Sequence, residues 1–301
     1  MNPNLTLLRR VVAQPWAVHS DTLRLFTRLL LSGEQPDKAP AKITSPAKSR
    51  ATRGRSGLRA GDYEPLNWES GEALEDGCLP DLPELPSGIT VLMPWGILGR
   101  AWSAVERYWL DPVDVDQIVQ EIAETPEGST VVLWFRSPGG VISGVPETAA
   151  QLRQLGKTRR LIAFTDDLCC SAAYWLAAQC SEIHATPTAD IGSIGVYIAL
   201  YDYTEYLAKL GVSLELFKAG NMKAMGLEGN PLSDEESALL QSQVDESYRA
   251  FTGDVTRNRA IAEATMQGQS LRGKNALDAN LVDTFWPSAA AFFAALGKGK
   301  I

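Results

Sequence analysis

Short apolar runs alternate with segments of helical spacing along most of this chain, and that alternation restricts its fold more than any other feature. Residues 131–135 form a continuous apolar run, as is typical of a strand buried on both faces of a sheet. Residues 145–155 repeat apolar side chains at helical spacing. Strands that alternate with helices predict an α/β domain with a largely parallel sheet.

The same patterns predict the other elements. Residues 137–140, Ser-Pro-Gly-Gly, read as a turn. A long helix should begin after Ser233, because Glu236 three residues later completes a capping-box pattern. We also expect helices at residues 115–122 and 172–179, and strands at residues 89–94, 161–164, 183–185, 194–200 and 214–217.

Composition divides the 301 residues into four parts. Residues 1–33 contain an amphipathic stretch at 21–31, which predicts a short helical N-terminal extension. Residues 34–87 are first basic and then rich in proline and acidic residues. They have few large apolar groups, so we expect a flexible linker. The main domain is expected at residues 88–286, followed by a C-terminal helix or tail at 287–301.

Charge, cysteine spacing and hydropathy argue against several classes of protein. A formal net charge of −8 gives no reason to expect nucleic-acid binding. The four cysteines lack C-x-x-C spacing, so we expect free buried thiols in a reducing compartment, with no metal site and no cofactor. We see neither a signal peptide nor a run of about 18 apolar residues, so we expect a cytoplasmic protein without a membrane span.

The chain has few side chains that could act as the general base for a nucleophile, since it contains only two histidines. A Ser-His-Asp triad would have to use His19, before the linker, or His184, in a short strand-like piece that favours a structural role. A serine can instead be activated by a lysine whose charged form is disfavoured by burial. Lys223 has no charged neighbour in sequence, whereas its competitor Lys218 follows an expected strand. Ser171 directly precedes a helix-forming run, although a serine there is usually only an N-cap.

Five segments carry motifs that follow one another in a fixed order. The most specific is Ala-Thr-Pro-Thr-Ala-Asp-Ile-Gly-Ser-Ile-Gly-Val at residues 185–196. The others are Phe-Arg-Ser-Pro-Gly-Gly at 135–140, Cys-Ser-Ala-Ala-Tyr-Trp-Leu-Ala at 170–177, Lys-Ala-Met-Gly at 223–226, and the closing segment 273–283. Together they resemble the signal peptide peptidase A-like serine peptidases. That resemblance implies a ClpP/crotonase-like superfold with repeated β-β-α units.

The resemblance also implies a role for each matching residue. Ser171 corresponds to the nucleophile and Lys223 to the general base, while Ser193 corresponds to a serine that orients the lysine amine. Gly140 corresponds to the oxyanion-hole glycine, and the backbone N–H of Ala172 is expected to assist it. The sequence departs from the family where Ala172-Ala173 replaces a glycine pair and where Ala224 replaces a frequent acidic residue; neither change removes a dyad member.

The opening of the chain, residues 14–18 and the amphipathic stretch, resembles the branch found in tailed bacteriophages and prophages. This implies a Ser/Lys-dyad endopeptidase that processes scaffold, portal or capsid proteins in the host cytoplasm or the procapsid. It also implies a homo-oligomer in which neighbouring protomers can complete the site. The alternatives are a crotonase-type acyl-CoA enzyme without a serine nucleophile, and a non-enzymatic structural protein that binds capsid or scaffold.

Overall fold

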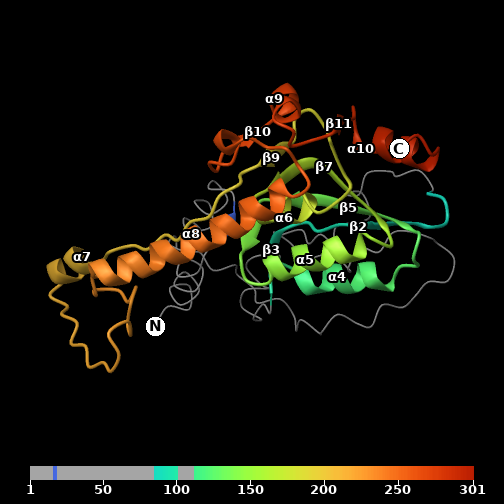
Figure 1. Cartoon of the computed structure of the whole chain (residues 1–301). Helices are drawn as coiled ribbons and strands as arrows, with labels where there is room; N and C mark the ends of the chain where they lie inside the picture. The colour runs from blue at the N-terminus through green and yellow to red at the C-terminus, as the bar shows by residue number, and fades with distance from the viewer. Residues whose placement is uncertain (1–15, 19–84, 101–111) are drawn as a thin grey trace, which may run out of the picture.

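The computed structural model describes residues 16–18, 85–100 and 112–301 (Figure 1). A seven-stranded sheet forms the centre, with the path β10-β9-β7-β5-β2; β8 lies beside that path and pairs with β7 and β11. All its pairings are parallel except that of β10 with β9, so the predicted α/β class with a largely parallel sheet is confirmed. The strands are β2 (Ile89–Leu92), β5 (Thr130–Ser137), β7 (Arg160–Cys170), β8 (Glu182–Ala185), β9 (Asp190–Gly192), β10 (Ser270–Leu271) and β11 (Thr284–Phe285).

The side chains of β5 alternate between two buried layers, which explains its continuous apolar run. Val131 and Leu133 pack with three helices on one face, whereas Val132 and Trp134 pack with a C-terminal helix on the other. On that second face the ring of Phe292 stacks on a phenylalanine of β7. The first layer contains α4 (Val115–Glu124), α5 (Val145–Leu155) and α6 (Ala172–Ala177), and the second contains α10 (Ala289–Gly297). The domain boundary predicted at residue 286 stays a prediction.

A second sheet of four strands lies beside the first, in the order β1-β6-β3-β4. It contains the glycine pair of the predicted turn at residues 137–140: the chain turns at Pro138, and Gly139 and Gly140 begin a strand. The element order is β2-β3-β4-α4 and then β5-β6-α5, so three strands precede the first helix and two precede the second. The strands are β1 (Trp16–Val18), β3 (Ile97–Gly99), β4 (Pro112–Asp114) and β6 (Gly139–Val141).

The long helix α8 (Asp234–Thr256) extends away from the two sheets and carries α7 (Thr204–Lys209) at its far end (Figure 1). The predicted capping box is confirmed, since the Ser233 and Glu236 side chains each bond the other's backbone N–H. Near its C-terminal end, α8 buries Phe251 and Val255 in the core of the body. We call residues 200–246, which project from the body, the arm.

The strands predicted at residues 194–200 and 214–217 are wrong. The first segment starts in the core, where Ile194 is buried, and then leads out into the arm without forming a strand, and the second lies within the arm (Figure 1). β-prone residues form a strand only where a neighbouring strand supplies partners. The residues 214–217 instead leave apolar side chains exposed.

Several expectations fall outside the described residues. These are the amphipathic helix at 21–31, nearly all of the linker at 34–87, His19 and Cys78. Within the described ranges, no helix is both long and apolar enough to cross a bilayer.

Candidate active site

Ser171 joins the last strand residue of β7 to the first turn of α6. Its backbone has φ 56° and ψ −119°, a conformation that residues with a side chain rarely adopt and that costs free energy. Its N–H donates to the carbonyl oxygen of Gly192 at 2.7 Å, and its side chain makes no capping bond to α6. The residue is buried, with 1% of its surface exposed. Ser171 is therefore held in a strained turn and does not serve as an ordinary N-cap.

The register between β7 and β9 brings a second serine beside Ser171. Cys170 pairs with Gly192 in parallel, so the next residues, Ser171 and Ser193, leave the sheet side by side. Ser193 also has a positive φ of 51°, and its N–H donates to the carbonyl oxygen of Gln269 at 2.8 Å. The structure thus brings together two residues that the sequence places 22 positions apart.

The glycine pair Gly139-Gly140 comes near Ser171 because it follows β5, the strand that pairs with β7. Ser137 of β5 pairs with Cys169 of β7, so Gly139 and Ser171 each follow two residues later, and β6 contacts α6. A Cβ atom on Gly140 would lie 1.8 Å from the carbonyl oxygen of Leu98, so this position accepts only glycine. Glycine at residue 140 therefore allows β6 to approach β3 closely, and β6 contacts the helix that Ser171 precedes.

Helix α6 is fixed to the body by groups that the sequence did not single out. The Trp175 ring stacks on Phe251 at a centroid distance of 4.5 Å, and its Nε1–H donates to the carboxylate of Asp254 at 2.9 Å. Arg153 forms an ion pair with the same carboxylate at 3.0 Å. Ala172 occupies the first helical position, where the backbone N–H has no acceptor within the helix. Together these contacts hold the start of α6, and with it Ser171, in place.

Lys223 lies apart from this group. It is exposed and belongs to the arm, between α7 and α8, whereas Ser171 is buried in the body (Figure 1). At 1.5 Å per residue, the start of α8 lies about 25 Å along the helix axis from Phe251, which packs on α6. The structure of one chain therefore does not bring Lys223 to Ser171. The competitor Lys218 is also exposed, and its Nζ donates to the carbonyl oxygen of Asn221 at 2.9 Å.

The cysteines near Ser171 do not offer a competing nucleophile. Burial raises the pKa of Cys170 to about 12 and raises the pKa of Cys169 well above its usual value, so both thiols stay protonated near neutral pH. Both are free and buried, as is Cys180, which agrees with the expectation for these three residues. Within the described residues, no three His, Cys, Asp or Glu side chains are grouped as metal ligands would be.

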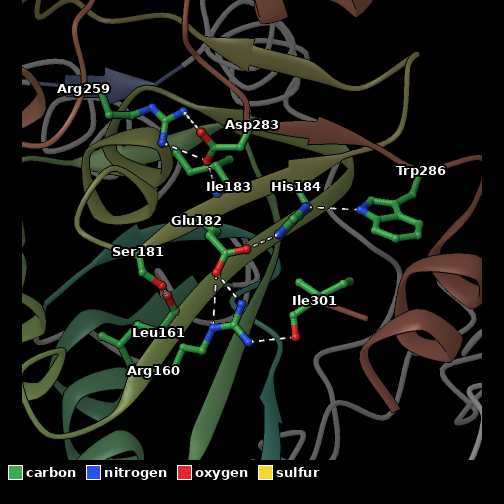
Figure 2. A network of polar contacts seen from close by, with 10 residues as sticks. All are labelled: Arg160, Leu161, Ser181, Glu182, Ile183, His184, Arg259, Asp283, Trp286 and Ile301. Carbon is green, nitrogen blue, oxygen red and sulfur yellow. Dashed lines mark hydrogen bonds and ion pairs between the residues drawn. The ribbon is translucent and has the colours of Figure 1, made fainter. Parts of the chain in front are cut away.

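His184 belongs to a structural network at the opposite end of β7 (Figure 2). Its Nδ1 accepts a hydrogen bond from Trp286 Nε1 at 3.2 Å, and its Nε2 lies 3.2 Å from the carboxylate of Glu182. Burial lowers the pKa of His184, against the effect of Glu182. It pairs with Phe164, seven residues before Ser171, which corresponds to roughly 20 Å along a strand. The structural interpretation of His184 is supported.

Comparisons with known proteins find relatives that are named as proteases or peptidases. Capsid assembly protease C of Escherichia phage lambda is 29% identical over 205 residues, which is 66% of this chain and 47% of that protein. A putative signal peptide peptidase SppA of Enterococcus faecium is 31% identical over 175 residues, 55% of this chain and 49% of that protein. The chain thus spans about half the length of these curated relatives.

The solved structure of a point mutant of ClpP1 from Listeria monocytogenes covers 67% of this chain and 93% of its own at 7% identity, with a TM-score of 0.42. The profile of Peptidase family S49 matches residues 153–295, which include Ser171, Ser193 and Lys223. The resemblance to signal peptide peptidase A-like peptidases is confirmed, and the chain carries a peptidase family S49 domain over residues 153–295.

Proposed function

We propose that this chain is a serine endopeptidase in which Ser171 of one copy is activated by Lys223 of a neighbouring copy. The observation that carries the proposal is the separation described above. A strained, buried serine lies beside Ser193 and Gly140, while the only lysine that the family resemblance assigns is exposed on the arm.

The chemistry follows from the roles that the resemblance assigns. The neutral amine of Lys223 takes the proton of the Ser171 hydroxyl as Oγ bonds to the carbonyl carbon of the substrate. The N–H groups of Gly140 and Ala172 stabilise the oxyanion, and Ser193 orients the amine. The C–N bond then breaks, and the leaving amine takes the proton from Lys223. Water then attacks the acyl-enzyme and gives a proton to Lys223. As the ester C–O bond breaks, Ser171 Oγ takes that proton from Lys223, and the acid leaves.

The arm supplies the surface for a second copy. The arm carries several large apolar side chains that are exposed to solvent, and the most exposed of them is Phe217, at 92%. A contact between the arm of one copy and the body of the next joins two different surfaces, and such contacts form a ring when the rotation between copies closes. Burial in that contact would also place Lys223 in the apolar surroundings that favour its neutral form. The other exposed apolar groups are Tyr201, Tyr206, Leu210, Val212, Leu214, Leu216 and Met222.

The proposed substrates are scaffold, portal or capsid proteins of a phage procapsid, processed in the bacterial host cytoplasm or the procapsid. This rests on the opening residues of the chain and on its relatives. One of these is named as a capsid assembly protease, and another, from Enterobacteria phage P21, as a head-tail preconnector protein.

Mixing two inactive variants tests the proposal directly. Ser171→Ala and Lys223→Ala should each abolish cleavage of an unfolded protein such as casein. In mixed assemblies with equal amounts of both, about one quarter of the sites combine an intact serine with an intact lysine, so about one quarter of wild-type activity should return. Lys218→Ala is the matched control and should stay active.

Three outcomes would contradict the proposal in different ways. If the two variants are inactive and their mixture regains nothing although they co-assemble, the two residues act within one chain. If Lys223→Ala stays active while Lys218→Ala does not, the base is Lys218. If the wild-type protein cleaves neither casein nor its cognate scaffold, a non-enzymatic role becomes the better interpretation.

A further inference from the structure

The strand β6 has two edges, and the N-terminal segment of the chain occupies the one that a substrate would need. On one edge β6 pairs with β3 in parallel, through Gly140 and Leu98. On the other edge it pairs with β1 in antiparallel orientation, and Ala17 lies opposite Gly140. The strand β1 ends its sheet, so β6 is its only sheet partner among the described residues.

A peptide bound at the candidate site must run along β6. Its reactive carbonyl has to reach Ser171 and the N–H of Gly140, and β3 already covers the first edge of β6. An extended peptide binds such an edge by adding a strand, through main-chain hydrogen bonds that tolerate many sequences. The second edge of β6 is therefore the docking edge for a substrate strand, and β1 lies on it.

We propose that residues 16–18 of this chain occupy the peptide-binding edge of its own site and compete with substrate for it; this proposal rests on the proposed function. Among the described residues, the pairing of β1 with β6 involves three residues of each strand. A pairing of this length can exchange with an incoming strand, so β1 acts in this proposal as an internal competitor that does not close the site permanently. When β1 leaves, β6 presents an unpaired edge to an incoming chain.

Two proline variants provide a test and its matched control. Adjacent residues of a strand point their N–H groups in opposite directions, so one of Ala17 and Val18 directs its N–H toward β6 and the other directs it away. Ala17→Pro and Val18→Pro each remove one N–H, but only one of these belongs to the pairing with β6. The two variants differ by a single position and should behave differently.

The first measurement needs no catalysis. In full-length protein with Ser171→Ala, a fluorescent peptide with the sequence of residues 11–23 is titrated and its anisotropy followed. The proline that faces β6 should tighten peptide binding severalfold over the parent, because the site is open more often. The other proline should leave the affinity near that of the parent. Equal affinities in both variants and the parent would overturn the proposal, whether or not Ser171 is a nucleophile.

The second measurement is the hydrolysis of casein by the same variants with Ser171 intact. An internal competitor raises the apparent KM and leaves kcat unchanged, so the inward-facing proline should lower KM severalfold at constant kcat. A purely structural role of β1 would instead lower kcat or stability in that variant, and this would contradict the proposal. So would a wild-type KM that rises with enzyme concentration, since the strand would then come from another copy.

Discussion

The backbone strain at Ser171 predicts that glycine at this position makes the protein more stable than alanine does. Both Ser171→Gly and Ser171→Ala remove the hydroxyl, so both should be inactive, and they differ in how they tolerate φ 56° and ψ −119°. Relief of this strain should stabilise the folded glycine variant by about 1–3 kcal/mol. The greater conformational entropy of glycine in the unfolded chain lowers that gain by about 0.5–1 kcal/mol.

The net effect is about 1 kcal/mol in favour of Ser171→Gly, which corresponds to roughly 2–4 °C in Tm for a domain of this size. Urea unfolding followed by tryptophan fluorescence measures it, with the slope m expected to be the same in both variants. Ser143 is the control, because it is exposed and does not have a positive φ. There, glycine should be less stable than alanine by about 0.5–1 kcal/mol. If glycine is the less stable choice at both positions, Ser171 is not strained.

Three further predictions concern the surroundings of the site. Because burial lowers the pKa of His184, the unfolded chain takes up this proton first as pH falls below about 6.5, so His184→Gln should lose less unfolding free energy than wild type between pH 7.5 and 5.5. Asp254→Asn weakens the hydrogen bond that Trp175 donates and removes the ion pair with Arg153. It should lower the unfolding free energy in urea by about 1.5–3 kcal/mol and should also lower the cleavage activity. Phe217→Ser should change protomer stability by less than about 0.5 kcal/mol, yet reduce assembly and activity in sedimentation and cleavage assays.

A specific outcome would contradict each of these three predictions. An unchanged pH dependence in His184→Gln would assign the loss of stability to other groups. Full activity in Asp254→Asn would separate the anchoring of α6 from the reactivity of Ser171. Lys209→Ser, also exposed on the arm, is the control for Phe217→Ser; an equal loss of assembly in both would argue against a specific apolar contact.

Elements with local causes were predictable from the sequence. The apolar run of β5 and the capping box at Ser233 each carry their signal within a few residues, and both were found where expected. The two wrong strands fail for a related reason: their β-prone residues were read correctly, but strand formation also depends on a partner strand, which a short sequence window does not reveal.

For the candidate site, the sequence predicted a set of residues but not their arrangement. Family motifs pointed to Ser171, Ser193 and Gly140, whereas their closeness depends on the registers of β7 with β5 and with β9, which no local pattern reveals. The anchoring by Asp254 comes from a helix that begins 63 residues after Ser171. The sequence around Lys223 suggested an apolar setting, and one chain alone does not provide it.

The length of α8 gives the arm the mechanical properties of a lever. Its base is fixed by Phe251 against Trp175, and a tilt of about 10° there displaces the far end by roughly 4–5 Å. A proton transfer requires donor and acceptor within about 3 Å, so such a tilt would be enough to disengage a base carried by the arm. If Lys223 is that base, an isolated protomer is inactive, and contact with a neighbouring copy that fixes the position of the arm determines when cleavage begins.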